Sequence, residues 1–345
     1  MREMKNTSTA CALLANVSRS GRVESQHFGA AVVVTRTGRQ QSWGDTTASV
    51  YTRSAIKPLQ ALPLVELGIA ARLGLEPAAL ALACASHAGT AAHVAAVERF
   101  LAAAGFGEAD LQCGPHAPFD RDSRLAMARA GARPRRIHNN CSGKHTGFLL
   151  VARELGVPLE RYLDPDAASQ RVIRDTVAAM ADVSPATVAA GVDGCGAPTL
   201  RLSLEALAAA FCRFANPDDV PDVRAGACRS LSDAMIREPM LLCGEGTLTT
   251  ELVRAGGGAV LPKNGAEGVY AVGVRGPGDR GCGIAVKVAD GQGRGYEPVI
   301  VELLRRHGVW DAVPPALASF ARPTVRNTLG AVVGHVECAL EAGAR

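Results

Sequence analysis

The chain has 345 residues, and its 37 basic and 33 acidic side chains give a net charge of +4. Hydrophobic residues make up 48% of the chain and charged residues 20%, which excludes an intrinsically disordered or strongly acidic protein. The basic residues are scattered and only 4% of residues are aromatic, so the sequence does not predict nucleic-acid binding. At roughly 150 residues per domain, the length favours two domains or one fold with an inserted subdomain.

The predicted elements begin with a β-branched strand at 28–35, which a short hairpin near Gly38 and Gly44 would follow. Residues 54–68 have helical apolar spacing, with Pro58 tolerated in the first turn. The middle of the chain predicts helices at 93–104, 145–155, 167–181, 203–215 and 223–237. The last hundred residues predict strands at 259–263, 268–274 and 283–288, then an amphipathic helix at 297–307.

This order of strands, helices, strands and helix predicts an α/β domain built from both ends of the chain. We place that domain at 1–90 and 240–345 and a mainly helical domain at 91–239, with the active site at their interface. The uncharged stretch 77–97 is long enough to suggest a membrane helix, but Ser86, His87 and His93 interrupt it. It is therefore interpreted as a buried element that carries a polar site.

Two further features bear on the cellular compartment. The apolar run at 10–15 is too short for a signal peptide, so we expect a cytoplasmic protein that does not bind membranes. The ten cysteines form no C-x-x-C pair, and in a reducing compartment they should be thiols, mostly in the core.

The first candidate for chemistry is Ser54-Ala55-Ile56-Lys57. On a helix start, this spacing puts the serine and the lysine on one face, where the lysine could act as the base that a serine nucleophile needs. The motif follows a predicted hairpin and opens an apolar helix, as in β-lactamases and penicillin-binding proteins. Ser86-His87-Ala88 and Lys263-Asn264-Gly265 stand where the second and third motifs of those enzymes would fall. The alternative is a helix start, a buried serine and a turn.

The second candidate comprises two Gly-rich loops, Asn139–Gly147 and Asp193–Pro198, each of which contains a cysteine. The first lacks the leading glycine of a P-loop and has His after Lys, so it is not one. It could bind an anion or a metal, and the thiolates of Cys141 and Cys195 with one or two nitrogens could bind zinc. The alternative is two buried turn cysteines.

Together these segments resemble the asparaginase II family, the rhizobial-type L-asparaginases, over nearly the whole chain. The matching segments are TRSAIKPLQ, CASHAG, HNNCSGKHTGFL, DGCGAPT and LPKNGAEGVY. The resemblance implies a fold similar to serine β-lactamases and glutaminases, with a mainly antiparallel sheet flanked by helices and a helical domain. It also implies a homodimer. The segment 242–247 (LCGEGT) fits the family's loop there only loosely.

The resemblance also implies roles for individual residues. The catalytic pairs would be Ser54 with Lys57, and Ser86 with Lys263. The zinc ligands would be Cys141, Lys144 and Cys195. The residues bordering the substrate would be Arg53, His145 and Asp193.

These roles define an expected reaction. Ser54, deprotonated by Lys57, would attack the side-chain amide of L-asparagine; ammonia would leave, and water would hydrolyse the acyl-enzyme to aspartate. Lys57 and Lys263 held close would disfavour each other's protonation and keep one amine neutral, with Ser86 as a proton relay. Arg53 suits the substrate carboxylate and Asp193 its ammonium.

Three alternatives remain open from the sequence. A glutaminase would differ only by accepting one more methylene, a difference worth roughly 1–3 kcal/mol in a pocket. A β-lactam-interacting enzyme would need export, for which no signal is visible. A non-catalytic amino-acid-binding or metal-binding protein would have no use for a lysine beside each serine.

Overall fold

The computed structural model describes residues 11–341 and divides the chain into two compact units. The first unit contains the chain up to Ala55, the segment Leu202–Asn216 and the chain from Ala255 onward. The second contains Ile56–Arg201 and Pro217–Arg254. Each unit is therefore assembled from segments that are distant in sequence, and the boundary near Ala55 falls inside the predicted Ser-x-x-Lys motif.

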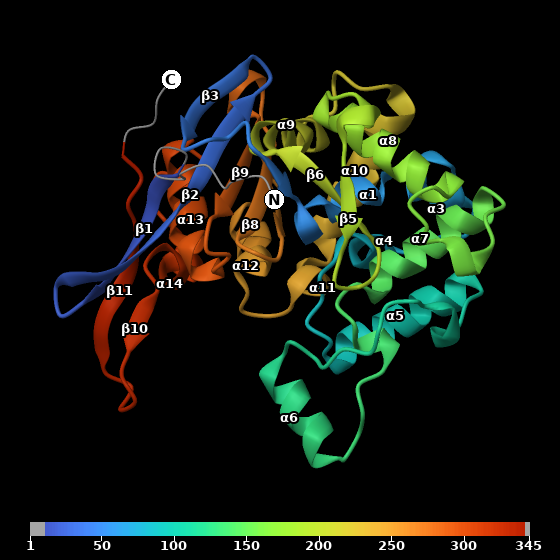
Figure 1. Cartoon of the computed structure of the whole chain (residues 1–345), viewed down its shortest axis with the longest axis horizontal. Helices are drawn as coiled ribbons and strands as arrows, with labels where there is room; N and C mark the ends of the chain where they lie inside the picture. The colour runs from blue at the N-terminus through green and yellow to red at the C-terminus, as the bar shows by residue number, and fades with distance from the viewer. Residues whose placement is uncertain (1–10, 342–345) are drawn as a thin grey trace, which may run out of the picture. The chain divides into compact units, whose positions relative to one another are not determined.

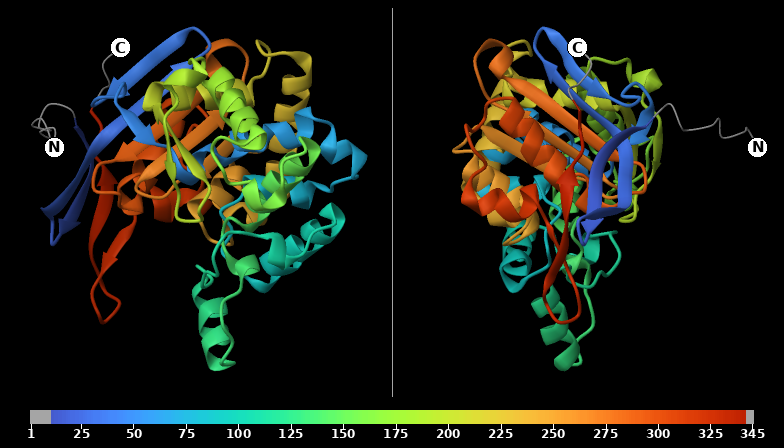
Figure 2. Two further views of the ribbon diagram at one scale, coloured as in Figure 1. Left: turned by 45° about the vertical axis from the view of Figure 1, so that its right-hand side comes forward. Right: turned by 90° about the vertical axis from the view of Figure 1, so that its left-hand side faces the viewer.

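The first unit is built on an eight-stranded sheet of order β10-β11-β1-β2-β9-β8-β7, with β3 paired to β2 (Figure 1). Its strands are β1 (Ala12–Arg19), β2 (Arg22–Thr35), β3 (Gly38–Trp43), β7 (Val260–Asn264), β8 (Val269–Val274), β9 (Cys282–Val288), β10 (Thr324–Arg326) and β11 (Val332–Cys338). The pairings are antiparallel, which confirms the predicted mainly antiparallel sheet. Figure 2 shows β1–β2 in blue and β10–β11 in red as two long hairpins.

Helix α9 (Leu204–Ala215) packs on β2, β8 and β9 of this sheet. The close approach depends on Gly273 and Gly283, which are paired across β8 and β9. A β-carbon at Gly283 would lie 1.7 Å from the carbonyl oxygen of Ala208, and one at Gly273 would lie 2.6 Å from that of Phe211. Because side chains alternate along a strand, Lys263, which pairs with Ala271, lies on the same face of the sheet as these glycines.

The remaining helices of the first unit are α13 (Glu297–Arg306) and α14 (Ala318–Ala321), and β4 (Ser49–Tyr51) also belongs to it. Helix α13 contacts β1, β9 and β11 through an apolar face that includes Val299, Ile300 and Leu303, as its predicted amphipathic pattern requires.

The second unit is mainly helical. Its helices are α1 (Lys57–Gln60), α2 (Leu62–Glu66), α3 (Ile69–Arg72), α4 (Pro77–Cys84), α5 (Ala91–Ala104), α6 (Arg121–Arg129), α7 (Ser142–Glu154), α8 (Ala168–Ala181), α10 (Asp222–Arg237), α11 (Pro239–Cys243) and α12 (Leu248–Ala255), whose last residue falls in the first unit. Strand β5 (Ala190–Val192) pairs with β6 (Pro198–Ser203), whose last two residues fall in the first unit. The buried middle of the unit is formed by α4, which contacts α5, α7, α10 and α11.

The helices predicted in the middle of the chain are confirmed to within a few residues, but the single helix predicted at 54–68 is wrong. The chain there forms a 3-10 turn (Arg53–Ile56), then α1 and α2, which are broken at Ala61. Pro63 causes the break, because proline has no N–H to donate and its ring clashes with the carbonyl one turn earlier. Within residues 11–341 no helix is both long enough and apolar enough to cross a membrane.

Candidate active site

The first unit holds the Arg53–Ser54 turn. Strand β4 leads into the 3-10 turn, which is closed by a hydrogen bond from the Ala55 N–H to the Thr52 carbonyl over 3.2 Å. Arg53 has a φ of +51°, a left-handed conformation that is uncommon for a residue with a side chain. Its guanidinium lies 4.0 Å from the carboxylate of Glu267, while Ser54 is half-buried. The local backbone thus fixes Arg53 and Ser54 in one tight turn that runs directly into Lys57.

The predicted catalytic residue Lys263 lies in the same unit, at the end of β7. Its side chain is fully buried and donates hydrogen bonds to the backbone and side-chain oxygens of Asn264 over 2.8 and 2.7 Å. The next residue, Gly265, touches the Ser54 turn: a β-carbon there would lie 3.0 Å from the Thr52 oxygen and 3.2 Å from the Ala55 nitrogen. The absence of a side chain at Gly265 therefore lets the end of β7 lie against the turn that carries Ser54.

The second unit brings Lys57 and Ser86 together. The ammonium of Lys57, in the first turn of α1, donates to the Ser86 hydroxyl over 2.9 Å and to the Ala85 carbonyl over 2.6 Å. Both side chains are buried, with exposures of 1% and 6%. The Ser86 N–H donates to the carbonyl of Leu242 over 2.9 Å. Two predicted catalytic residues are thus in direct contact, and their loop is held by a segment that the sequence analysis did not connect with them.

His87 also fixes this loop. Gly89 donates its N–H to Nδ1 of His87 over 3.2 Å, so the ring proton is on Nε2, which donates to the Ser142 hydroxyl over 2.8 Å. Burial, with smaller effects of nearby His93, Lys57 and His138, holds the pKa of His87 well below its usual range. The neutral ring therefore ties the Ser86 loop to the first turn of α7.

Helix α7 carries the C-S-G-K motif and lies very close to α4. A β-carbon at Gly143 would lie 2.5 Å from the Leu82 carbonyl oxygen, so only glycine allows this approach. Cys141, at the start of the helix, and Lys144 are both buried. The glycine of the motif therefore has a packing role: it brings the Cys141 end of α7 next to the end of α4, from which the Ser86 loop begins.

Cys141, Lys144 and Cys195 lie close together in this region. Lys144 donates to the sulfur of Cys195 over 3.2 Å. A hydrogen bond from Cys195 holds the pKa of Cys141 well below its usual range, and the charges of Lys57 and Lys144 act in the same direction. The same hydrogen bond, together with burial, raises the pKa of Cys195. The contacts thus run from Lys144 to Cys195 and from Cys195 to Cys141.

Does this set of donors fit zinc? Two sulfurs and one nitrogen gather at one point, and thiolate sulfur is a preferred zinc ligand. The 3.2 Å between Lys144 Nζ and Cys195 Sγ is near the roughly 3.6 Å that tetrahedral zinc would impose on such a pair. Burial alone would lower the pKa of Lys144, but Cys195, Cys141 and Asp193 together raise it, so the amine would have to lose its proton to bind. Across residues 11–341 no three His, Cys, Asp or Glu side chains form a metal site. A zinc ion here would therefore need the lysine, with which the set fits.

The other predicted substrate residues are held by their own partners. His145 follows Lys144 on α7 and contacts the hydroxyl of Tyr162 through Nδ1 over 2.6 Å. Burial, with Lys144 and Lys57 nearby, holds the pKa of His145 well below its usual range. Asp193 begins the turn between β5 and β6, where its carboxylate accepts the Gly194 N–H over 2.8 Å. The turn continues through Gly196, whose φ of +84° favours glycine, and this geometry positions Cys195.

Three contributors to this region were missed from the sequence: Leu242, Ser142 and Tyr162. Leu242 acts through a backbone carbonyl, which no motif reveals, and Tyr162 lies in no matched segment. Gly244, in the loosely fitting loop 242–247, lies against Ala88; a β-carbon at Gly244 would be 2.9 Å from that of Ala88. The departure from the family pattern therefore lies next to the Ser86 loop.

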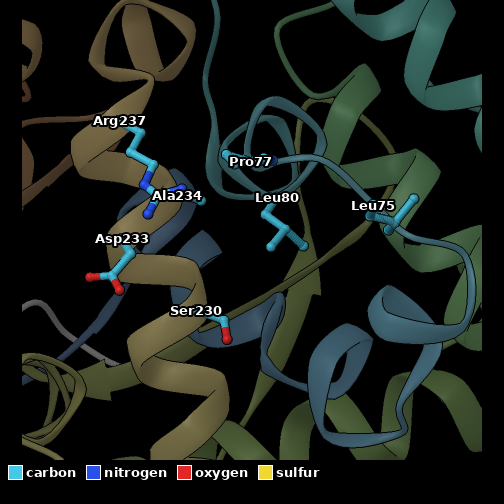
Figure 3. Close-up of a pocket in the computed structure, with 7 residues that line it drawn as sticks. All are labelled: Leu75, Pro77, Leu80, Ser230, Asp233, Ala234 and Arg237. Atoms are coloured by element: carbon cyan, nitrogen blue, oxygen red, sulfur yellow. The ribbon is translucent and has the colours of Figure 1, made fainter.

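A cavity of about 210 Å³ lies elsewhere in the second unit, between the start of α4 and the end of α10 (Figure 3). In Figure 3, Leu80 faces α10 from α4, opposite Ala234 and Arg237. None of the predicted site residues lines this cavity. The predicted chemistry therefore does not coincide with it.

Comparison with known structures gives matches of low identity. Mglu aligns with 86% of this chain and 65% of its own, at 15% identity and a TM-score of 0.42. A Bacillus glutaminase aligns with 80% of this chain and 89% of its own, at 12% identity and 0.38. A probable glutaminase from Bacillus subtilis complexed with 6-diazo-5-oxo-L-norleucine aligns with 77% of this chain and 78% of its own, at 15% identity and a TM-score of 0.35. The chain thus spans less than two thirds of the length of Mglu.

No curated protein matches the chain significantly. The family description L-asparaginase II, in contrast, matches residues 15–338, which include every predicted catalytic, metal and substrate residue. That match extends through both structural units and confirms the resemblance drawn from the five motifs. The chain belongs to the L-asparaginase II family.

Proposed function

We propose that this protein hydrolyses the side-chain amide of L-asparagine to L-aspartate and ammonia, with Ser54 as the nucleophile. Membership of the L-asparaginase II family supports an amidohydrolase acting on a small molecule. The observation that carries the proposal is the buried hydrogen bond between Lys57 and Ser86, at 2.9 Å. A lysine amine in contact with one hydroxyl, three residues after a second, is the arrangement that a serine nucleophile needs for its activation.

In the proposed reaction, the Ser54 oxygen attacks the amide carbon while its proton passes to Lys57, which must be a neutral amine at this step. The tetrahedral intermediate collapses when the nitrogen takes up a proton, and ammonia leaves. Water then attacks the acyl-enzyme, and aspartate is released. Ser86 would relay protons to and from Lys57, because its hydroxyl both donates and accepts. The buried setting of Lys57 strengthens each of these interactions, since there is little water to compete with them.

Substrate recognition is assigned to charged groups on two loops. The Arg53 guanidinium, which lies 4.0 Å from the exposed carboxylate of Glu267, suits the substrate carboxylate because its planar N–H groups can bind both oxygens of a carboxylate. Asp193, at the β5–β6 turn, suits the substrate ammonium. We also propose a zinc ion held by Cys141, Lys144 and Cys195. When bound it would supply positive charge that favours an anionic substrate.

Ammonia release from L-asparagine tests this function directly, with L-glutamine and a β-lactam as competing substrates. We expect asparagine to be turned over, and Ser54→Ala to lower kcat about a thousand-fold or more. Ser230→Ala, on the surface of α10, is the matched control and should behave like the wild type. If the enzyme prefers glutamine, the proposed substrate is wrong. Near wild-type turnover by a folded Ser54→Ala protein would refute the role of Ser54 as the nucleophile.

A further inference from the structure

His145 is fully buried, and its Nε2 atom has no hydrogen-bond partner within residues 11–341. A buried polar nitrogen without a partner is costly, so it calls for an explanation such as a bound water, an ion or a functional role. The other ring nitrogen, Nδ1, lies 2.6 Å from the hydroxyl of Tyr162. The question is therefore which of the two nitrogens carries the proton.

The hydrogen bonds of Tyr162 determine the answer. The N–H of Gln112 donates to the Tyr162 oxygen over 2.8 Å, so the phenolic proton must point elsewhere. Its available acceptor is Nδ1 of His145. An Nδ1 that accepts this proton carries none itself, and the ring proton then belongs to Nε2. The unpartnered atom is therefore an N–H donor.

Tyr162 is well suited to hold this arrangement. It is completely buried, and its own carbonyl accepts a hydrogen bond from the side chain of Gln170 over 2.7 Å. The side chain of Gln112 in turn donates to the carbonyl of Glu160 over 2.9 Å. The ring of Tyr162 meets that of His145 edge-on, with an interplanar angle of 87° and 5.6 Å between the ring centroids. The tyrosine is thus fixed at both ends, so it cannot turn its hydroxyl away from the histidine without breaking these contacts.

We propose that Tyr162 is a positioning residue that keeps His145 as an Nε2–H donor, and that this donor binds a carboxylate oxygen of the amino-acid substrate. The location favours an anionic acceptor: His145 comes one turn after Cys141 and directly after Lys144, on a helix whose first turns contain no acidic residue. An oxygen ligand would satisfy the buried Nε2–H. This inference rests on the proposed function for the identity of the substrate.

The tautomer can be measured in the ligand-free protein, independently of any reaction. In protein labelled with ¹⁵N-histidine, two-bond ¹H–¹⁵N correlations distinguish a protonated ring nitrogen from an unprotonated one. We expect one ring with protonated Nε2 and unprotonated Nδ1, whose signals disappear in His145→Gln. In Tyr162→Phe the same ring should shift toward a mixture of tautomers. A proton on Nδ1 in the wild type would overturn the proposal.

Substrate binding gives the second test. L-aspartate, which carries the carboxylate, should shift the Nε2 signal of His145 in the wild type and bind at least about tenfold more weakly to Tyr162→Phe. In ammonia release, Tyr162→Phe should raise KM about tenfold and change kcat less. Tyr296→Phe, which also removes one tyrosine hydroxyl, should change neither. An unshifted Nε2 signal at saturating aspartate would mean that only water meets this donor, and would overturn the role in binding even if the enzyme hydrolyses asparagine.

Discussion

The ammonium of Lys57 and the hydroxyl of Ser86 form a buried hydrogen bond of 2.9 Å, although 29 residues separate them in the chain. The same nitrogen donates to the Ala85 carbonyl, and Lys57 is among the groups that hold the pKa of Cys141 well below its usual range. Lys57 thereby connects the serine pair predicted for catalysis with the cysteine pair predicted for metal binding. A change at Lys57 should therefore affect both.

The first prediction concerns this link. Lys57→Met removes the proposed base while keeping an unbranched side chain, and we expect kcat for asparagine to fall about a thousand-fold or more. Ser86→Ala should cost less, about a hundred-fold, at the lower end of what is typical when a proton-transfer group is lost. Because the two side chains act as one unit, the double variant should be little worse than Lys57→Met alone. Multiplicative losses in the double variant would show that the two residues act separately.

The second prediction concerns metal. If Cys141, Lys144 and Cys195 bind zinc, purified protein should contain one zinc per chain, and either Cys141→Ser or Cys195→Ser should abolish it. Lys144→Met should weaken binding as well. The matched control is Cys228→Ser on α10, where burial raises the thiol pKa to about 12 and no metal is expected. Elemental analysis measures the zinc content of all four variants. Unchanged zinc content in both Cys141→Ser and Cys195→Ser would show that the metal binds at another site. Chelation should raise KM for asparagine more than it lowers kcat.

Long amphipathic helices and β-branched strands were predictable from the sequence, since each shows a clear apolar period. Strand β1 was missed because its sequence, ALLANVSR, places asparagine, serine and arginine among the apolar residues. β10 is only three residues long and β11 includes glycine, histidine and glutamate, so neither has a strong strand pattern. Their place in the sheet comes from pairing with distant partners, which local periodicity does not encode.

The candidate site divides in a similar way. Residues whose side chains lie in distinctive motifs, such as Lys57, Ser86 and Cys195, could be selected as candidates from the sequence. Leu242 could not, because its contribution is a carbonyl that any residue could provide. Tyr162 was missed because its hydroxyl is placed by packing at the end of a short turn rather than by a motif. Contacts of this kind cannot be predicted from a motif, because they form only when the fold brings distant segments together.

The third prediction is a loss of stability on mild acidification. His87 is buried and neutral, and its pKa is held well below the usual 6.5 by burial and by nearby His93, Lys57 and His138. Below about pH 6.5 the unfolded chain binds a proton that the folded chain does not, so the free energy of unfolding falls as the pH is lowered. One such group contributes about 2 kcal/mol between pH 6.5 and 5. The pKa of buried His145 is also held well below its usual range, so His145 should lower the free energy of unfolding on acidification in the same way.

Urea unfolding of the wild type and of His87→Gln at pH 7 and pH 5 measures this effect. The variant is expected to be less stable at pH 7, because the bond to Ser142 is weakened, but to lose less stability on acidification. His307→Gln, at the end of α13, serves as the control and should keep the wild-type pH dependence. An equal loss of stability in His87→Gln and the wild type would show that other groups cause the acid sensitivity.

The last prediction concerns the glycine contact that seats α9 on the sheet. In Gly283→Ala the new methyl would lie 1.7 Å from the Ala208 carbonyl oxygen, far inside contact distance, so α9 or β9 must move. Overpacking of this kind typically costs about 1–3 kcal/mol, and because the obstructing atom is backbone we expect the upper end of that range. Gly226→Ala is the matched change, because Gly226 lies within α10 and a β-carbon there meets nothing within 4 Å. It should instead raise stability by about 0.5–1 kcal/mol through helix propensity. Thermal unfolding followed by circular dichroism should therefore give a lower midpoint than the wild type for Gly283→Ala and a higher one for Gly226→Ala. A wild-type midpoint for Gly283→Ala would mean that α9 does not pack as closely against β9 as the structure shows.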